Sequence, residues 1–137
     1  MNIPDVYTWH SEVKPNELDI QEIVNNAFYL QYFHEARLCI LMLKGIDWEE
    51  WHRNGFNIVV IHVDMSIKQS LKANDQFYVH STYTLSGRLK IIFEQIIYKK
   101  GDDTLVAKAI TTLSCVSIRT GKPVMPQNLL NLLFNLK

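Results

Sequence analysis

Two hydrophobic patterns divide the chain at Gly55. After this residue, apolar and polar positions alternate with a period of two over four long segments, a pattern typical of strands with one buried face. The four predicted strands cover residues 56–69, 75–87, 89–103 and 104–123. The connections between them are short, and short links between long strands predict antiparallel hairpins.

The first part of the chain predicts one strand and two helices. Residues 6–13 are β-prone and roughly alternate, and Pro15 breaks the pattern just beyond them. Residues 27–43 contain no Gly or Pro and predict a long helix, with Asn25 and Asn26 as good N-cap residues before it.

Glycines and a proline mark the ends of the other helices. Gly45 ends the long helix at low cost because glycine adopts the left-handed conformation that follows many helices. Residues 47–55 predict a short second helix, which Asp47 caps. Residues 126–137 predict a terminal amphipathic helix, with Pro126 near its start.

The long predicted helix is apolar on nearly every side, so protein should bury it on most sides. At about 25 Å it is too short to cross a bilayer comfortably. The economical arrangement is an α+β fold in which an antiparallel sheet of about five strands curls around a central helix. Because one sheet covers one side only, the other side and the sheet edges predict a homodimer or homotetramer.

Composition supports an ordinary globular protein. The 137 residues are 47% apolar and 20% charged, which predicts one domain over residues 1–137. The net charge of zero gives no reason to expect nucleic-acid binding. Residues 1–63 carry nine acidic and four basic residues, whereas residues 64–137 carry five acidic and ten basic ones. This asymmetry indicates two attracting surfaces, simple scatter, or a basic rim for an anionic ligand.

Cysteine use and the N-terminus predict a cytoplasmic protein. Cys39 and Cys115 lie in apolar runs without metal-binding spacing, so we expect two buried, reduced thiols. The N-terminal residues lack a basic and then apolar signal pattern, and no stretch approaches the ~20 apolar residues of a membrane span. His62, Asp64 and His80 lack a recognised metal-ligand spacing, so we predict no metal and no cofactor.

One motif is more specific than these patterns. Asp19 is followed after four residues by Val24-Asn25-Asn26, then by Tyr29-Leu30 and by Glu35-Ala36-Arg37. This text resembles the D-x-x-x-H-V-N-N-x-x-Y-L pattern, with a following E-A-R, of acyl-CoA thioesterases in the 4-hydroxybenzoyl-CoA thioesterase superfamily, especially the long-chain acyl-CoA thioesterase III branch. The resemblance covers nearly the whole chain and implies the hotdog fold.

The loop departs from the family pattern at two points. Ile23 stands where the thioesterase III branch has histidine, and Gln21 and Glu22 occupy the stretch where a second branch has glycine. The carboxylate Asp19 is therefore kept, while the histidine that most often accompanies it in the family is replaced by Ile23. An isoleucine side chain can exclude water from the site but cannot orient a substrate.

The resemblance implies catalytic roles for Asp19, Asn26 and Ala27. Asp19 would be the base or nucleophile, and the backbone N–H groups of Asn26 and Ala27 would hold the oxyanion. Helix physics agrees with the second role, because first-turn amides lack internal partners and carry the positive end of the helix dipole. From spacing alone, Asp19 can equally be a loop carboxylate that caps a turn or meets a lysine.

The predicted substrate-binding residues lie in the loop, along the helix and on the first long strand. They are Gln21, Glu22, Ile23, Asn25, Tyr29, Phe33, Val59, Ile61 and Lys68. The aromatic and aliphatic members can line an acyl tunnel or be plain core. Lys68 belongs to a group of basic residues near strand ends, with Lys72, Arg88 and Lys90. Related hotdog proteins contact the nucleotide end of coenzyme A in this neighbourhood. Each of these four residues can instead be a solvated surface charge.

We therefore expect a thioesterase that hydrolyses acyl-CoA or acyl-carrier-protein thioesters. The alternative is a non-catalytic hotdog module that binds acyl thioesters or a carrier protein, which the replacement of histidine by Ile23 favours. The absence of histidine between His10 and His34 counts against a dehydratase or isomerase.

Overall fold

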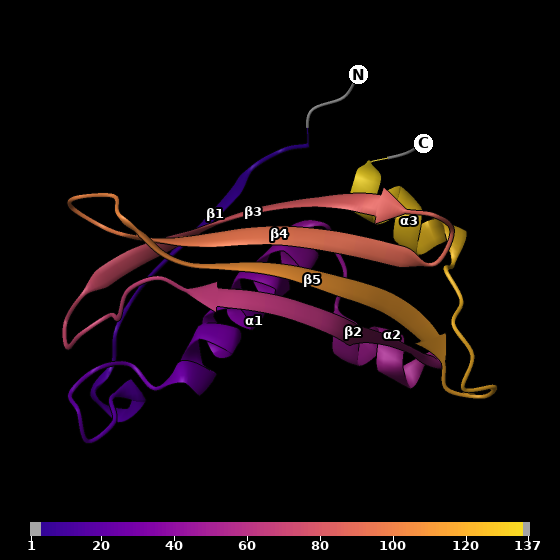
Figure 1. Cartoon of the computed structure of the whole chain (residues 1–137). Coiled ribbons are helices and arrows are strands. Elements are labelled where there is room, and N and C mark those ends of the chain that lie inside the picture. The colour runs from indigo at the N-terminus through magenta and orange to yellow at the C-terminus, as the bar shows by residue number, and fades with distance from the viewer. Residues whose placement is uncertain (1–3, 136–137) are drawn as a thin grey trace.

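One antiparallel sheet carries the fold, in the strand order β1-β3-β4-β5-β2 (Figure 1). The structure is a computed structural model, and it describes residues 4–135. The strands are β1 (Tyr7–Glu12), β2 (Phe56–Ile67), β3 (Gln76–Ser86), β4 (Lys90–Lys99) and β5 (Leu105–Ser117). The helices are the 3-10 turn η1 (Pro15–Glu17), α1 (Asn26–Leu43), α2 (Trp48–Arg53) and α3 (Gln127–Phe134).

The predicted elements are confirmed, with shifts at their ends. All neighbouring strands pair antiparallel, as the short connections predicted. The last predicted strand was too long, because β5 ends at Ser117 and the chain then turns through Gly121, with φ of +71°. The terminal helix begins at Gln127, directly after Pro126, and the last two residues of its predicted range lie outside the described residues.

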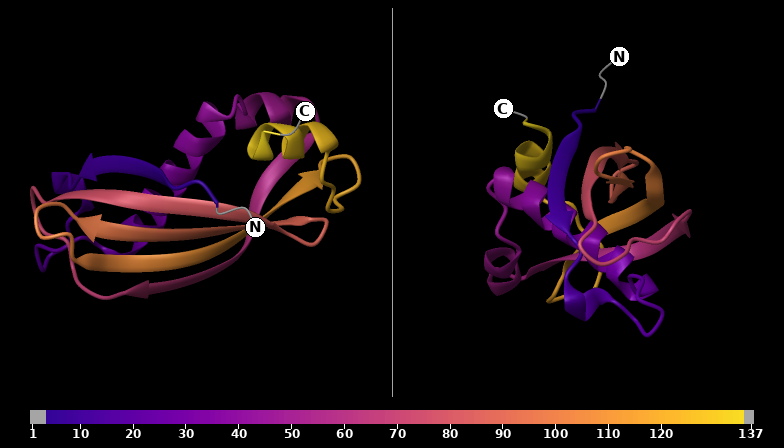
Figure 2. Two further views of the ribbon diagram at one scale, coloured as in Figure 1. Left: turned by 90° about the horizontal axis from the view of Figure 1, so that it is seen from above. Right: turned by 90° about the vertical axis from the view of Figure 1, so that its left-hand side faces the viewer.

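The helices α1 and α3 lie on the same face of the curved sheet (Figure 2). The side chain of Asn25 caps α1, and Gly45 ends it with φ of +76° while the Ile46 N–H donates to the Leu41 carbonyl at 2.8 Å. This left-handed position explains the glycine, because a side chain there would be strained.

One face of α1 is buried against the sheet. Its buried residues are Tyr29, Tyr32, Phe33, Ala36, Arg37, Ile40 and Leu41. Leu30, Met42 and Leu43 on other sides are 43%, 68% and 75% exposed. Within one chain the single sheet covers only one side of the helix, as the sequence predicts, and the burial of its other sides by a second copy stays a prediction.

The two cysteines differ in environment. Cys115 is buried as predicted, and burial raises the pKa of its thiol to about 11. Cys39 is exposed, so the prediction of a buried thiol is wrong there. The apolar run around Cys39 is helical, and a helix turns every third or fourth residue of such a run away from the core.

A polar belt separates two apolar clusters in the core. One cluster surrounds Tyr29 and Phe33, and the other surrounds Ile40 and Phe93. The belt is built on Gln95, which is fully buried: its Oε1 accepts a hydrogen bond from Arg37 Nη1 at 2.9 Å, and its Nε2 donates to the Phe33 carbonyl and to Ser81 Oγ, each at 3.0 Å. Within residues 4–135, the buried Arg37 guanidinium has no carboxylate partner, and burial lowers its pKa to about 10.

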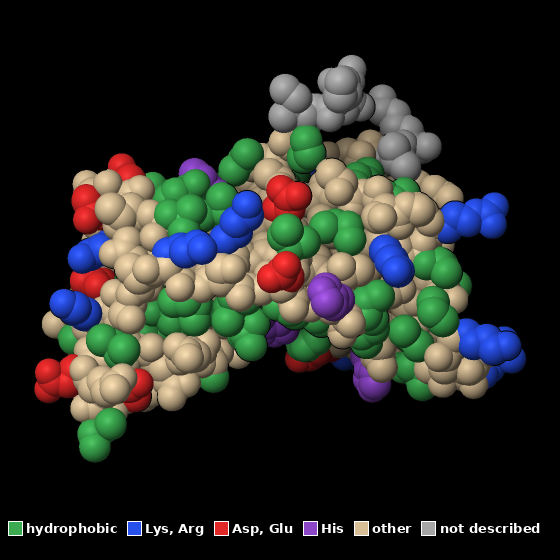
Figure 3. All heavy atoms as spheres, viewed as in Figure 1, with side chains coloured by type: hydrophobic (Ala, Val, Ile, Leu, Met, Phe, Trp, Pro, Cys, Tyr) green, Lys and Arg blue, Asp and Glu red, His purple; other side chains and the backbone are tan. Residues whose placement is uncertain are grey.

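The opposite face of the sheet is open in this chain. Figure 3 shows it with hydrophobic side chains grouped among scattered acidic and basic ones, so no single sign of charge dominates this view. The strand β2 forms one edge of the sheet and has a register shift between Val60 and His62. At the middle of this edge, Val60, Ile61 and Val63 are 45%, 50% and 38% exposed.

Candidate active site

A small hairpin places Asp19 near the start of α1. Leu18 bridges Val24, the Asp19 N–H donates to the Ile23 carbonyl at 2.9 Å, and the Glu22 N–H donates to the Asp19 carbonyl at 3.0 Å. Glu22 takes a φ of +64°, in the left-handed region where this turn needs it. The hairpin therefore brings the acidic loop back to the helix that follows it.

The Asp19 carboxylate is held by its own loop. Its Oδ1 accepts a hydrogen bond from the Gln21 N–H at 2.8 Å, which is the Asx-type turn that aspartate favours. The side chain of Ile20 at the tip of the loop is 98% exposed, so the carboxylate is not enclosed from this side within one chain. Asp19 thus caps a turn, and its loop pairs through Leu18 and Val24 with the residues that precede α1.

The start of α1 offers a free backbone donor at Asn26. Asn25 Oδ1 accepts from the Ala27 N–H at 3.0 Å, and the Asn25 carbonyl accepts from the Phe28 N–H at 2.9 Å. Among the described residues, the Asn26 N–H has no hydrogen-bond partner. Of the two predicted oxyanion donors, Asn26 is therefore available, while Ala27 is occupied by the helix cap.

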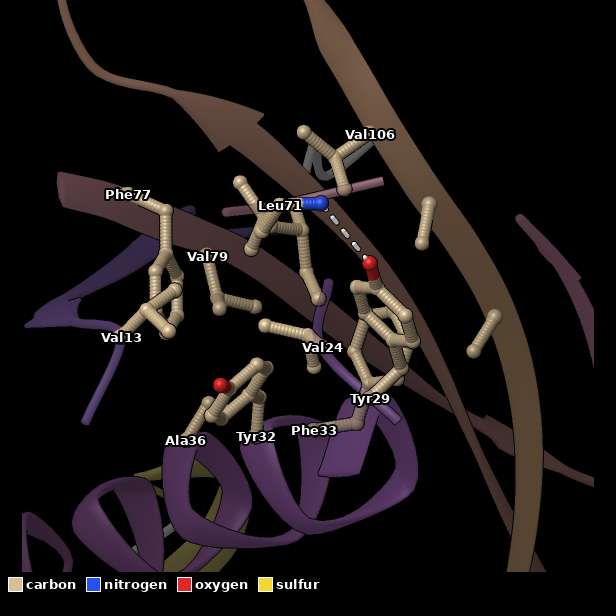
Figure 4. Close-up of a cluster of buried hydrophobic side chains, with 13 residues drawn as sticks. Val13, Val24, Tyr29, Tyr32, Phe33, Ala36, Leu71, Phe77, Val79 and Val106 are labelled. Carbon is tan, nitrogen blue, oxygen red and sulfur yellow. Dashed lines mark hydrogen bonds between the residues drawn. The ribbon is translucent and has the colours of Figure 1, made fainter. Parts of the chain in front are cut away.

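Two tyrosines of α1, which Figure 4 shows in the core cluster, tie the helix to neighbouring segments. Tyr29 Oη accepts from the Leu71 N–H at 3.0 Å, which ties α1 to the segment after β2. The Tyr32 hydroxyl donates to Glu17 Oε1 at 2.8 Å, which ties α1 to the segment before the loop. Burial raises the pKa of both tyrosines, and for Tyr32 the hydrogen bond to Glu17 raises it further, so both hydroxyls stay protonated.

The predicted binding residues divide into three groups in space. Gln21, Glu22, Ile23 and Asn25 share the loop with Asp19, and Ile23 bridges Lys72 in the segment that also holds the exposed Lys68. Tyr29 and Phe33 are each 1% exposed and belong to the core cluster of Figure 4. Val59 and Ile61 lie on β2, and Ile61 is half exposed at its edge.

The four predicted basic residues do not form one patch. Lys68 and Lys72 lie in the connection from β2 to β3, next to the Asp19 hairpin. Arg88 and Lys90 lie in and after the β3–β4 turn, at the opposite end of the sheet (Figure 1). Only the first pair is placed to meet a ligand at the start of α1 of the same chain.

Sequence reasoning missed Glu17 and a cavity beside α2. Glu17 is 8% exposed and accepts hydrogen bonds from the Lys14 N–H and the Tyr32 hydroxyl, both at 2.8 Å. The order Lys-Pro-Asn-Glu is a detectable signal, because proline at the first position and glutamate at the third are typical of a helical start. The residues that line the cavity, among them Trp48 and His52, form no sequence motif that would predict a site.

Residues 4–135 carry neither a membrane-spanning helix nor a cluster of metal ligands. No helix in this range is long and apolar enough to cross a membrane, and no group of three or more His, Cys, Asp or Glu side chains is arranged to hold a metal ion.

Comparisons with known proteins agree with the fold and the motif. A profile of the Thioesterase-like superfamily matches residues 13–133. A putative esterase of Aquifex aeolicus is 31% identical over 128 residues, which cover 93% of this chain and 97% of that protein. The long-chain acyl-CoA thioesterase FadM of Escherichia coli is 27% identical over 112 residues, which cover 81% of this chain and 83% of FadM.

Solved structures match the architecture. The crystal structure of a 1,4-dihydroxy-2-naphthoyl-CoA thioesterase from Synechocystis superposes with a TM-score of 0.89 over 96% of this chain and 98% of that one, at 19% identity. This likeness shows the hotdog fold. Because the family profile spans most of the chain, and the Aquifex relative matches at 31% identity over nearly its full length, the chain belongs to the thioesterase-like superfamily of hotdog-fold hydrolases.

Proposed function

We propose that this protein hydrolyses acyl-CoA or acyl-carrier-protein thioesters to a free acid and a thiol, with Asp19 as base or nucleophile. The observation that carries the proposal is the hairpin that returns Asp19 to the helix start: Leu18 bridges Val24, one residue before the Asn25 cap. A carboxylate and an unpaired first-turn amide then stand in one neighbourhood, as attack on a carbonyl requires.

The proposed reaction needs little beyond these two groups. Asp19 takes a proton from a water that attacks the thioester carbonyl, or attacks the carbonyl itself. The Asn26 N–H, at the positive end of the α1 dipole, donates to the oxygen that becomes negative. The C–S bond then breaks, and the thiolate is a good leaving group, so no strong general acid is required. The Ala27 N–H joins as a second donor only when the Asn25 side chain turns away from it.

Lys68 and Lys72 are the basic residues that we expect beside the nucleotide end of the substrate. Both follow β2, and the Ile23–Lys72 bridge holds this segment against the Asp19 hairpin. Their charges suit the phosphates of coenzyme A or the phosphopantetheine arm of a carrier protein. No enclosed phosphate loop is needed for this, because surface lysines act as point charges from outside.

A second copy of the chain is the other proposed partner. The exposed Leu30, Met42 and Leu43 of α1 and the apolar edge of β2 are surfaces that a homodimer or homotetramer would cover. Sedimentation at micromolar concentration tests this directly, and a monodisperse monomer would contradict it.

The decisive experiment is thiol release from a panel of acyl-CoAs by wild type and Asp19→Asn. The asparagine Oδ1 can still accept from the Gln21 N–H, so the loop conformation is kept while the base is removed. We expect kcat to fall about 10²- to 10⁴-fold. Glu94→Gln, an exposed carboxylate on β4, is the matched control and should keep wild-type activity. Equal rates for wild type and Asp19→Asn would remove Asp19 from the mechanism.

One alternative has a specific observation behind it. The Ala27 N–H is already occupied by the Asn25 cap, and Ile23 replaces the family histidine, which favours a module that binds acyl thioesters without hydrolysing them. Such a module would gain thermal stability from acyl-CoA by mass action without releasing thiol. Hydrolysis of any acyl-CoA that is lost in Asp19→Asn would exclude this binding-only function.

A further inference from the structure

The end of the sheet opposite the Asp19 hairpin carries basic and apolar residues without acidic ones. Two turns form it: the β3–β4 turn, residues 85–90, and the turn after β5, residues 117–123 (Figure 1). Their sequences are Leu-Ser-Gly-Arg-Leu-Lys and Ser-Ile-Arg-Thr-Gly-Lys-Pro, so each joins two basic residues with a glycine and a large aliphatic residue. Residues 84–93 and 116–126 contain no Asp or Glu. We call these two turns and their side chains the basic end.

The side chains of the basic end are open to solvent. Leu85, Leu89 and Ile118 are 42%, 40% and 46% exposed. The basic side chains are exposed as well, and they are Arg88, Lys90, Arg119 and Lys122. The ion pair that residues 4–135 contain joins Lys99 to Asp75, so none of these four charges is neutralised in that part of the chain. In Figure 3 this end shows blue and green side chains, with no red among them on the face in view.

The other end of the sheet has mixed charges. Its β4–β5 turn reads Lys-Lys-Gly-Asp-Asp over residues 99–103, and Lys99 Nζ lies 3.8 Å from Asp75 Oδ1. The hairpin that holds Asp19 and Glu22 lies at that end too (Figure 1). The excess of basic residues in the second half of the sequence is therefore partly gathered at one end of the molecule, where it is not compensated.

Hydrogen bonds hold both turns of the basic end in place. Ser114 Oγ donates to the Leu89 carbonyl at 2.7 Å, which ties the first turn to β5. In the second turn, the Gly121 N–H donates to the Ser117 carbonyl at 2.8 Å, and the Ser117 N–H donates to the Lys122 carbonyl at 3.0 Å. The basic and apolar side chains are therefore presented on formed turns, and binding does not have to order a loose loop first.

We propose that the basic end docks on the surface of an anionic lipid bilayer. Each Lys or Arg near such a surface is attracted to its negative headgroups, which is worth about a fivefold gain in affinity. The aliphatic side chains on the turns enter the boundary between headgroups and acyl chains, while the long basic side chains extend back to the headgroups. Docking of this kind is peripheral and needs no spanning helix.

The combination of charge and apolar surface selects a bilayer among anionic partners. The phosphates of a nucleotide would engage the basic side chains and leave Leu85, Leu89 and Ile118 without a role. A protein partner favours one packed apolar centre with a polar rim, whereas these aliphatic side chains stand on two separate turns at the rim of the sheet (Figure 1). A bilayer interface is broad enough to meet both turns at once.

Co-sedimentation of the full chain with lipid vesicles tests the proposal. Wild type should bind vesicles of phosphatidylcholine with phosphatidylglycerol but not vesicles of phosphatidylcholine alone. Added NaCl should release it, because the Debye length falls to about 8 Å at physiological ionic strength. Arg119→Gln combined with Lys122→Gln should weaken binding about 25-fold, the value of two charges. Leu89→Ser combined with Ile118→Ser should weaken it about tenfold or more, because the aliphatic contact with the lipid is lost.

Matched variants at the mixed end are Lys100→Gln and Leu105→Ser, which change an exposed charge and an exposed aliphatic side chain. Both should bind vesicles as wild type does, and circular dichroism with thermal unfolding checks that every variant folds. Equal binding by wild type and the two double variants, or equal losses in the matched variants, would overturn the proposal.

Two other outcomes would assign the basic end to a different partner. If wild type does not bind anionic vesicles and the Arg119→Gln, Lys122→Gln variant raises KM for a short-chain acyl-CoA in free solution, the basic end contacts a nucleotide. If wild type binds an acidic carrier protein through these residues but not vesicles, the partner is a protein. Each result overturns the proposal. Vesicle binding is measured without turnover, so it stands or fails separately from the proposed thioesterase function.

Discussion

Replacing Gln95 by leucine probes the polar belt that divides the core. Gln95 is fully buried, accepts from Arg37 Nη1 at 2.9 Å and donates to the Phe33 carbonyl and Ser81 Oγ at 3.0 Å. Leucine keeps the approximate volume but removes the bond to a charged donor, worth about 1.5–3 kcal/mol, and the two neutral bonds, worth about 1 kcal/mol each. Part of this loss is recovered by the apolar surroundings, so we expect a destabilisation of about 3–5 kcal/mol, the usual cost of leaving a buried charge without its partner.

Urea unfolding at a fixed protein concentration measures this cost. The urea concentration at the midpoint of unfolding should fall, while the slope of the unfolding free energy against urea concentration stays constant, because the surface exposed on unfolding is unchanged. Equal protomer concentrations are required because association would stabilise the folded state. Arg37→Met in the same background is the matched variant. It removes the uncompensated guanidinium, whose burial already lowers its pKa to about 10, and should restore much of the lost stability.

A small effect would refute this reasoning. A cost below about 1 kcal/mol for Gln95→Leu would mean that the Arg37 guanidinium finds other partners, such as water, without penalty. Additive effects of the two substitutions in a double-mutant cycle would show that the pair is not coupled in the folded state.

Three further predictions follow from single groups. Cys39 should react rapidly with a thiol reagent at pH 8, whereas Cys115 should react only on unfolding, and two rapidly reacting thiols would contradict the burial of Cys115. Because burial raises the pKa of the Cys115 thiol to about 11, its contribution to the free energy of unfolding should fall as the pH rises from 9 to 11. The ring of His34 should titrate below the usual 6.5 by NMR, since burial lowers its pKa. As the pH falls below 6.5, the unfolded chain takes up the proton first, so the free energy of unfolding should fall. A titration midpoint above 6.5 would refute this. Tyr29→Phe should cost about 1–3 kcal/mol by leaving the Leu71 N–H without its acceptor, and hydrogen exchange at Leu71 should accelerate; unchanged protection would show that another group accepts this bond.

The sequence by itself determined the elements and the identity of the motif. Alternation after Gly55 is a local property of each strand, because neighbouring side chains point to opposite faces, so it predicted four strands, and the short connections between them predicted antiparallel pairing. Asn25 marks the start of α1 for an equally local reason, since its side chain reaches an amide two residues away. The spacing from Asp19 to Arg37 pointed to the hotdog thioesterases, and the family and fold comparisons bear this out.

Tertiary structure decided what those local patterns leave open. The apolar run of α1 could not show that Cys39 faces solvent and Arg37 the core, because the position of the sheet selects the buried face. The φ of +64° at Glu22 depends on how the loop closes on itself. The cavity of Trp48 and His52 arises where α2 meets β2. Such contacts between separate elements come from packing, and the periodicity of a sequence carries no record of them.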